Sequence, residues 1–251
     1  MTDPIFGNRS AWAALTNMDL CLQTMIAIQN VQDGGQRMAL FAGPSGWGKT
    51  YGAAYTTAVT DAVYVAAKAV WTHKSLLEAL AREMGIQRVA KTTARILDQI
   101  IEHLARDRRP IIIDEMDYIV NRKSVDVIRD IYDATFVPVL MIGMEALPSR
   151  LKEWEQFDNR LLTTVLAQPA SQEDGRKLRD LYCRQVAVSD DLADYITHAC
   201  AGVARRIVTN LIAAQTFAIE QLDTMSIDRA AWGNRPLKTG ELQIRRSGGA
   251  L

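Results

Sequence analysis

Residues 40–53 read LFAGPSGWGKTYGA and contain the pattern G-x-x-x-x-G-K-[ST] between Gly43 and Thr50. The apolar run before the pattern (RMALFAG, residues 37–43) predicts a buried strand, and the run after it predicts a helix. Glycines in such a loop let backbone N–H groups approach phosphate oxygens, and the start of the following helix favours negative charge. The pattern therefore predicts a nucleotide-binding loop within an α/β fold.

The predicted site binds a nucleotide with Mg²⁺, and each of its residues has an expected role. Lys49 is expected to reach the β- and γ-phosphates, and the Thr50 hydroxyl to bind Mg²⁺. The strand predicted over residues 109–115 (RPIIIDE) ends in Asp114, which would hold the metal through water, and in Glu115, which would orient or polarise the attacking water. For Trp47, packing on a neighbour is favoured over shielding of the phosphates. The residues predicted to bind the nucleotide in this core are Gly43, Pro44, Ser45, Gly46, Trp47, Gly48, Lys49, Thr50, Tyr51 and Asp114.

Strand and helix patterns alternate over the first two thirds of the chain. Besides the two strands named above, strands are predicted over residues 61–67, 138–143 and 163–168, and helices over residues 16–31, 72–84, 92–105 and 125–134. Such alternation predicts a parallel sheet covered on both faces.

After Pro169 the pattern is helical, over residues 171–185, 189–201 and 203–222. We therefore expect an α/β ATPase core over residues 1–168 and a small all-helical lid domain over residues 169–232. A C-terminal tail is expected over residues 233–251, made mildly basic by Arg245 and Arg246.

The composition argues against several classes of protein. The chain has 29 basic and 29 acidic residues, so a DNA-binding surface would have to be a local patch. Three unpatterned cysteines (Cys21, Cys183 and Cys200) suit a reducing compartment and argue against a zinc site or a disulfide framework. The N-terminus lacks the features of a signal peptide, and no stretch is long and apolar enough to span a membrane. A cytoplasmic protein is expected.

The strand predicted over residues 61–67 separates the two nucleotide-binding strands, as in the NTPases with an additional strand and a catalytic glutamate, and the trailing helical domain narrows these to the AAA+ group. Six segments then resemble the AAA+ ATPases of DNA transposition, namely the phage Mu B protein and TnsC-like regulators, with ExeA-type and IstB-type ATPases as more distant relatives. The segments are FAGPSGWGKT, VYVAAKAVWTHKSLLEALAREMG, RPIIIDEMDYIV, VPVLMIGMEALPSRLKEW, FDNRLLTTV and GVARRIVTNL.

The resemblance covers residues 39–218 and implies a fold, an activity and partners. It implies an AAA+ P-loop core with a five-stranded parallel sheet in the order 5-1-4-3-2. It also implies self-assembly as helical filaments or rings on double-stranded DNA, and delivery of that DNA to a transposase in a bacterial host cell. Hydrolysis would be stimulated by the transposase.

Two arginines gain roles from the resemblance. Arg160, just before the fifth predicted strand, matches the catalytic finger that reaches a neighbour's γ-phosphate, and Arg150 is the next candidate. The alternative is a surface arginine paired with Asp158 or Glu155.

Arg205 matches the sensor-2 residue that touches the nucleotide of its own subunit, with Arg206 as the fallback. The fourth strand ends MIGM (residues 141–144), without the polar residue usual at sensor 1, so unstimulated hydrolysis is expected to be slow.

About forty residues precede the glycine loop, so an extra N-terminal DNA-binding domain of the phage Mu B kind is expected to be absent, and DNA contacts are expected from the ATPase core. In the resembling family, loops after the second strand face the DNA and contact phosphates without reading sequence. The candidate DNA contacts are Lys68, Lys74, Arg88 and Lys91. The alternative for these four residues is that they belong to an ordinary solvated surface. For Trp71, packing in the core is favoured over stacking on bases.

Four functions follow in order of preference. The first is an ATP-dependent regulator of transposition that binds duplex DNA without sequence preference. The second is a helicase loader of the IstB or DnaC kind, which would favour single strands. The third is an ExeA-like ATPase associated with secretion. A small-molecule kinase is disfavoured, because Glu115 directly after Asp114 is typical of hydrolases.

Overall fold

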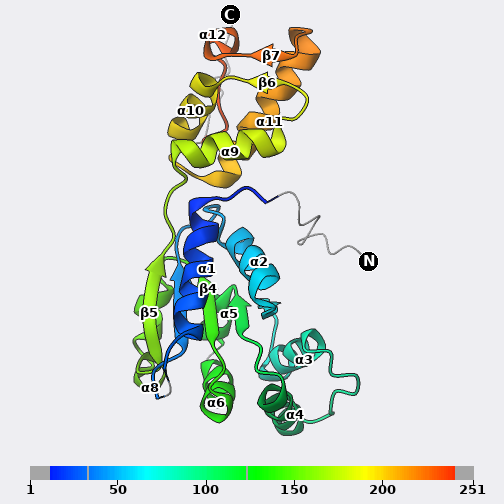
Figure 1. Cartoon of the computed structure of the whole chain (residues 1–251), viewed down its shortest axis with the longest axis vertical. Coiled ribbons are helices and arrows are strands. Elements are labelled where there is room, and N and C mark those ends of the chain that lie inside the picture. The colour runs from blue at the N-terminus through cyan, green and yellow to red at the C-terminus, as the bar shows by residue number, and fades with distance from the viewer. Residues whose placement is uncertain (1–11, 33, 123, 241–251) are drawn as a thin grey trace, which may run out of the picture. The chain divides into compact units, whose positions relative to one another are not determined.

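The computed structural model describes residues 12–32, 34–122 and 124–240, and the chain divides into two compact units, residues 1–168 and 169–251 (Figure 1). Arg245 and Arg246 of the predicted tail lie outside the described residues.

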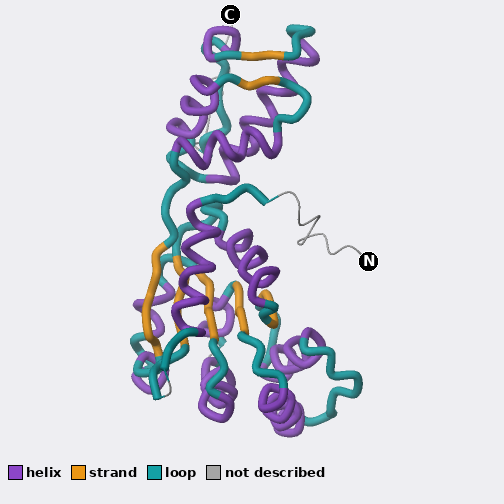
Figure 2. The backbone as a smooth tube through the Cα atoms, in the orientation of Figure 1, coloured by secondary structure: helices purple, strands orange, loops and turns teal. Residues whose placement is uncertain are grey.

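A five-stranded parallel sheet forms the centre of the first unit (Figure 2). Its order is β2-β3-β4-β1-β5, which confirms the predicted order 5-1-4-3-2. The strands β1, β3 and β4 are buried along their whole length, whereas β5 at the edge alternates between half-buried and exposed residues. The strands are β1 (Met38–Ala42), β2 (Val63–Ala66), β3 (Ile111–Asp114), β4 (Val139–Gly143) and β5 (Leu161–Leu166).

Helices cover both faces of this sheet, and the two faces bury different residues of each strand. Successive side chains of a strand point to opposite faces. In β1, Leu40 joins a core with α3, α4 and α6, whereas Phe41 joins a core with α1 and α2. The helices of this unit are α1 (Thr16–Gln29), α2 (Lys49–Thr60), α3 (His73–Glu83), α4 (Thr93–Arg106), α5 (Met116–Asn121), α6 (Val125–Thr135), α7 (Leu147–Leu151) and α8 (Glu155–Asp158).

The second unit consists of α9 (Gln172–Tyr182), β6 (Ala187–Val188), α10 (Asp190–Ala199), α11 (Ala204–Gln221), β7 (Ser226–Ile227) and α12 (Arg229–Trp232). The three long helices were predicted, but the expectation of a wholly helical domain has to be corrected. The strands β6 and β7 pair in parallel as a second, two-stranded sheet. Two-residue strands are too short to show an alternating pattern in the sequence.

The segment 233–240, predicted to begin the tail, contacts α11. The guanidinium of Arg235 lies 3.6 Å from the centre of the Phe217 ring, and Leu237 is buried. The backbone of Lys238 forms hydrogen bonds in both directions with the side chain of Asn210. The packed part of the second unit therefore continues past residue 232, to residue 240.

The three cysteines are buried and free. Burial raises the pKa of the Cys21 thiol to about 12 and that of Cys183 to about 11. Both thiols are therefore protonated at neutral pH and behave as small apolar core groups. Among the helices that the structure describes, none is long and apolar enough to cross a membrane.

Gly175 in α9 offers a test of the packing between α9 and α10. A Cβ added there would overlap the hydroxyl of Thr197 and lie 3.1 Å from its Cβ. In an exposed helix Gly→Ala stabilises by about 1 kcal/mol. We expect Gly175→Ala instead to lower the free energy of unfolding by about 1–3 kcal/mol, because the buried Thr197 would have to shift to admit the added methyl group.

Urea denaturation of the wild type and the variant measures this change. A second substitution, Thr197→Ala, removes the overlapping atoms and should recover part of the loss in the double variant. A stabilised Gly175→Ala protein would show that the two helices are not in close contact.

Candidate nucleotide-binding site

The glycine loop joins β1 to α2 and requires its glycines for two different reasons. Gly46 and Gly48 have φ angles of +82° and +84°, a region that residues with a Cβ rarely adopt. Gly43 is needed for space, because a Cβ there would lie 2.8 Å from the Cβ of Ala167. The backbone of the loop thus turns sharply and carries no side chains at these glycines, as the sequence pattern predicts.

Lys49 is the first residue of α2, and its side chain lies back over the loop. Its Nζ donates to the carbonyl oxygens of Gly43 at 2.7 Å and Pro44 at 2.8 Å. The first N–H groups of a helix have no partner within that helix, and the helix dipole is positive there. An ammonium group and a helix N-terminus at one loop form a suitable environment for phosphate.

Asp114, the last residue of β3, connects this strand to the glycine loop. Its carboxylate, on a residue only 3% exposed, accepts hydrogen bonds from Thr50 Oγ1 at 2.9 Å and Tyr64 Oη at 3.2 Å. Its other oxygen accepts from the backbone N–H of Glu115 at 2.8 Å. Hydroxyl and carboxylate oxygens are the ligands that Mg²⁺ prefers, so this pair fits the predicted metal. Tyr64 has no motif in the sequence and was not predicted.

Glu115 follows directly and has an unusual backbone. Its φ angle is +55°, in the left-handed region, and Glu115 is exposed to solvent. For a residue with a side chain this conformation costs on the order of 1 kcal/mol, and such positions are frequent in functional sites. The hydrogen bond to Asp114 fixes the peptide that precedes it, so the two acids are held in one geometry.

A third acid, Asp117 in α5, holds the end of β4. One of its oxygens accepts from the backbone N–H of Met144 at 2.7 Å, and the other from Arg150 Nη1 at 3.2 Å. Arg150 also donates to Asn121 Oδ1 at 2.6 Å. Residues 141–144 lack a polar side chain, and the link from this strand end to the segment after Asp114 is made by Asp117 instead. No sequence motif identifies Asp117.

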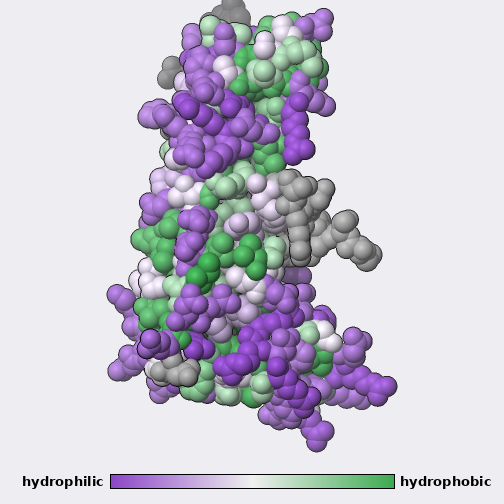
Figure 3. Space-filling view, viewed as in Figure 1, coloured by the Kyte–Doolittle hydropathy of each residue, from purple (hydrophilic) through white to green (hydrophobic). Residues whose placement is uncertain are grey.

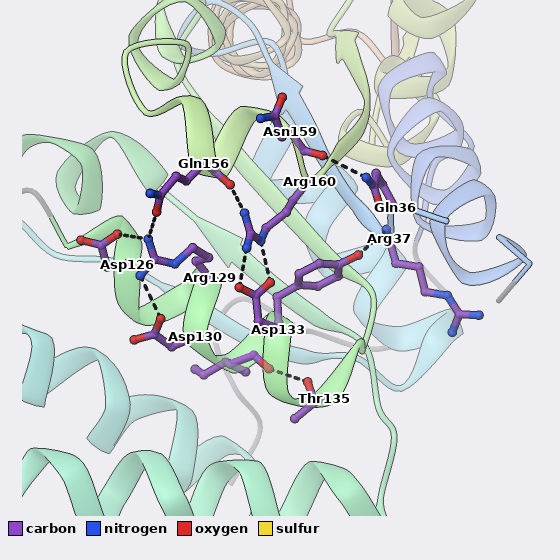
Figure 4. Close-up of polar contacts among 12 residues, drawn as sticks. Gln36, Arg37, Asp126, Arg129, Asp130, Asp133, Thr135, Gln156, Asn159 and Arg160 are labelled. Atoms are coloured by element: carbon purple, nitrogen blue, oxygen red, sulfur yellow. Dashed lines mark hydrogen bonds and ion pairs between the residues drawn. The ribbon is translucent and has the colours of Figure 1, made fainter. Parts of the chain in front are cut away.

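Arg160 lies just before β5 in a group of charged side chains (Figure 4). Its Nε and Nη2 donate to the two carboxylate oxygens of Asp133 in α6, each at 2.5 Å, and Nη1 donates to the carbonyl of Gln156. The hydrogen bond to Asp133 raises the pKa of Arg160 further above its ordinary value. The alternative pairing with Asp158 or Glu155 therefore has to be corrected, because the partner is Asp133.

Arg129 extends the same group of charges. It donates to Gln156 Oε1 at 2.8 Å and forms ion pairs with Asp126 at 2.8 Å and with Asp130 at 3.0 Å. The two arginines thus share Gln156 but contact different acids.

Arg205 and Arg206 lie in the first turn of α11, in the second unit. Both are exposed, but the guanidinium of Arg206 lies against Gly240. Within the described residues, the guanidinium of Arg205 makes no comparable contact.

The four basic residues predicted to contact DNA are exposed: Lys68, Lys74, Arg88 and Lys91. They lie in the region of α3 and α4, where the surface is predominantly hydrophilic (Figure 3). Lys74 lies 3.7 Å from Glu78. Lys68 Nζ lies 6.0 Å from the centre of the Trp71 ring. The Trp71 ring packs against the core, which is the role that the sequence favours for it. Gln99 of α4 holds the loop between α3 and α4 by bonds to the backbone of Arg88 and Ala90.

Comparison with known proteins supports this description. A family model for an AAA domain matches residues 32–151, which contain the glycine loop, Asp114 and Glu115. No curated protein matches the sequence.

Three similar solved structures have low sequence identity to this chain. The Aeropyrum pernix ORC2 protein, in ADPNP–ADP complexes, is 14% identical with a TM-score of 0.69, over 92% of this chain and 70% of that one. Cdc6p from Pyrobaculum aerophilum is 16% identical with a TM-score of 0.63, over 90% and 68%. The Aeropyrum pernix ORC1 protein in complex with DNA is 18% identical with a TM-score of 0.58, over 90% and 66%. The chain therefore has the α/β fold of an AAA+ P-loop core, and residues 32–151 match the model for an AAA domain.

Proposed function

We propose that the chain is an ATP-dependent AAA+ ATPase that binds duplex DNA without sequence preference and assembles on it as a filament or ring. The observation that carries this proposal is a basic segment on the same unit as the nucleotide loop. Residues 68–95 contain six basic and two acidic residues, in a chain whose net charge is zero. A local excess of positive charge is what binding to DNA phosphates requires.

In the proposed ATP site each residue keeps the role assigned from the sequence. Lys49 binds the β- and γ-phosphates, Thr50 and Asp114 hold the Mg²⁺, and Glu115 orients the attacking water. When bound, Mg²⁺ neutralises negative charge that develops on the phosphate oxygens. Arg205 of the second unit is the proposed sensor 2.

The basic segment begins beside the proposed metal site. The N–H of Ala67 donates to the carbonyl of Asp114 at 2.9 Å, and Lys68 is the next residue. Arg122, at the end of α5, donates to the carbonyl of Ala69 at 2.7 Å. A change at Asp114 on nucleotide binding therefore has a short covalent and hydrogen-bonded path to the basic segment.

Arg160 is proposed to act on the nucleotide of a neighbouring subunit. Within one chain, Nε and Nη2 along one edge of its guanidinium donate to the two carboxylate oxygens of Asp133. Reaching a neighbour requires Arg160 to exchange this carboxylate for a phosphate, which also accepts two parallel hydrogen bonds from a guanidinium and carries a larger negative charge. Hydrolysis would then depend on assembly, because the charge that stabilises the transition state comes from another subunit.

The transposition role rests on the resemblance of six segments to ATPases of that process. In that role the protein delivers target DNA to a transposase in the cytoplasm of a bacterial host, and the transposase stimulates hydrolysis. DNA binding itself is also supported by the likeness to the ORC1 protein, whose structure is a complex with DNA. The helicase-loader alternative differs in its preferred DNA, which would be single-stranded.

The DNA proposal is tested by fluorescence anisotropy with labelled duplex and single-stranded DNA of random sequence, in ATP, in ADP and without nucleotide. We expect cooperative binding to duplex DNA only with ATP. Substituting Arg88→Glu together with Lys91→Glu should weaken this binding at least about tenfold and reduce its dependence on salt, because each phosphate contact contributes to the salt slope.

The control for this test is Arg108→Glu with Lys152→Glu, which makes the same change of charge outside residues 68–95. An equal loss in the control would contradict a local DNA surface. A preference for single strands would favour the helicase loader, and the absence of binding with ATP hydrolysis intact would exclude the DNA proposal.

Glu115→Gln should separate ATP binding from hydrolysis. The substitution keeps the size of the side chain but removes the base, so we expect the rate of phosphate release to fall about 100-fold or more. ATP affinity, measured by equilibrium dialysis, should stay within about threefold of the wild type, because Glu115 contacts water in the proposed site. In contrast, Lys49→Ala should lose ATP affinity. Unchanged turnover in Glu115→Gln would show that another group is the base.

Mixing two inactive variants tests whether Arg160 acts between subunits. Arg160→Ala should lower turnover by about 1000-fold while ATP binding remains. A mixture of Arg160→Ala and Glu115→Gln subunits should regain activity, because the second variant supplies Arg160 to the intact Glu115 of the first. Arg129→Ala, in the same group of charges, should keep its turnover. Failure of the mixture to recover activity, under conditions in which subunits assemble, would assign Arg160 a purely structural role with Asp133.

A further inference from the structure

Asn17, in the first turn of α1, is a buried polar residue that no motif predicts. It is 6% exposed, and its side chain makes three short hydrogen bonds to distant backbone groups. Its Nδ2 donates to the carbonyls of Trp47 and Gln168, both at 2.7 Å. Its Oδ1 accepts from the N–H of Gln168 at 2.8 Å. One amide thus connects the middle of the glycine loop to Gln168, two residues after the end of β5.

The bond to Trp47 fixes the direction of one peptide in the loop. A trans peptide is planar, and its C=O and N–H point in opposite directions. Because the carbonyl of Trp47 points to Asn17, the N–H of Gly48 in the same peptide points away from Asn17. Gly48 has open space on its Cα, where an added Cβ would meet nothing within 4 Å. The hydrogen bond from Asn17 to Trp47 thus sets the direction of the Gly48 N–H.

The backbone of Asn17 is itself held in place by α2. A Cβ added at Gly52 would lie 2.9 Å from the Asn17 carbonyl oxygen and 3.0 Å from the Cβ of Cys21. The two helices are therefore in close contact at this point. Asn17 therefore reaches the loop from a helix that packs closely against α2.

The bonds to Gln168 use both backbone groups of the last residue in the first unit. The preceding residue, Ala167, makes the final ladder contact of β5 by donating to Ala42 at 2.8 Å. At the next residue, Gln168, the side chain of Asn17 bonds to the backbone in place of a neighbouring strand. The end of β5 and the glycine loop consequently depend on the same amide group.

We propose that Asn17 is a positioning residue for nucleotide binding. It holds the peptide between Trp47 and Gly48 in the orientation that phosphate binding requires, and it ties that orientation to the chain at Gln168. This inference rests on the proposed ATP site.

The second unit supplies a matched control. Asn210 in α11 is 1% exposed, and it pairs in the same way with the backbone of one distant residue. Its Nδ2 donates to the carbonyls of Lys238 at 3.2 Å and Arg206 at 2.9 Å, and its Oδ1 accepts from the N–H of Lys238 at 2.8 Å. Substitution of Asn210 therefore removes equivalent bonds from a buried helix position without touching the glycine loop.

The test compares Asn17→Asp with Asn210→Asp. An aspartate keeps the size of the side chain and can accept from Gln168, but it loses both donated bonds. We expect both variants to lose stability in urea, because each places a carboxylate against two carbonyls. Only Asn17→Asp should weaken the binding of Mg²⁺–ATP, by about tenfold or more, as measured by calorimetry on folded protein.

Several outcomes would overturn the proposal. Wild-type ATP affinity in Asn17→Asp would show that the loop keeps its orientation without this side chain. An equal loss of affinity in Asn210→Asp would show that the loss is not specific to the side chain that holds the glycine loop. Wild-type protein that does not bind ATP would overturn the proposed site together with this inference, whereas the first two outcomes leave the proposed site intact.

Hydrogen exchange on the unaltered chain gives a second test, should Asn17→Asp not fold. Bound ATP should slow the exchange of the Gln168 amide as well as the amides of the glycine loop, because the same side chain holds both. The amide of Lys238, which pairs with Asn210, is the internal reference. Protection of the loop without protection of Gln168 would contradict the connection.

Discussion

The hydrogen bond between Thr50 and Asp114 is the contact on which the proposed nucleotide site depends. It joins the loop after β1 to the end of β3, and the same carboxylate also binds Tyr64 from β2 and the backbone of Glu115. Burying a carboxylate is unfavourable unless it is hydrogen-bonded, so these contacts are a condition of its position at the end of the strand. The position of Glu115 follows from them.

The parallel sheet explains why these groups meet. The carboxyl ends of parallel strands lie at one edge, and ligands bind there in open α/β sheets. The ends of β1, β3 and β4 are connected further by side chains from helices, with Asp117 of α5 holding Met144 and Asn17 of α1 holding Trp47. The strands thus bring the segments together, and single polar side chains set the final orientation of the backbone.

The sequence predicted the parts of this arrangement that depend on local pattern. The glycine loop, the apolar strands and the long helices have recognisable spacing, and the sheet order followed from resemblance to a known family. Asn17, Tyr64, Asp117 and Asp133 were missed because their roles arise from contacts with residues distant in the sequence. The paired strands β6 and β7 and the short helices α5, α7 and α8 were missed because they are too short to show a period. The partner of Arg160 was expected among nearby acids, but it comes from α6.

The dependence of ATP affinity on Mg²⁺ tests the central claim most directly. ATP would be titrated calorimetrically into the wild type and into Asp114→Asn, each with Mg²⁺ and with a chelator. If Thr50 and Asp114 hold the metal, Mg²⁺ should strengthen ATP binding in the wild type, and this gain should be lost in Asp114→Asn. Equal affinity in the wild type with and without Mg²⁺, or the same gain in both proteins, would contradict the assignment of this carboxylate to a metal–nucleotide site.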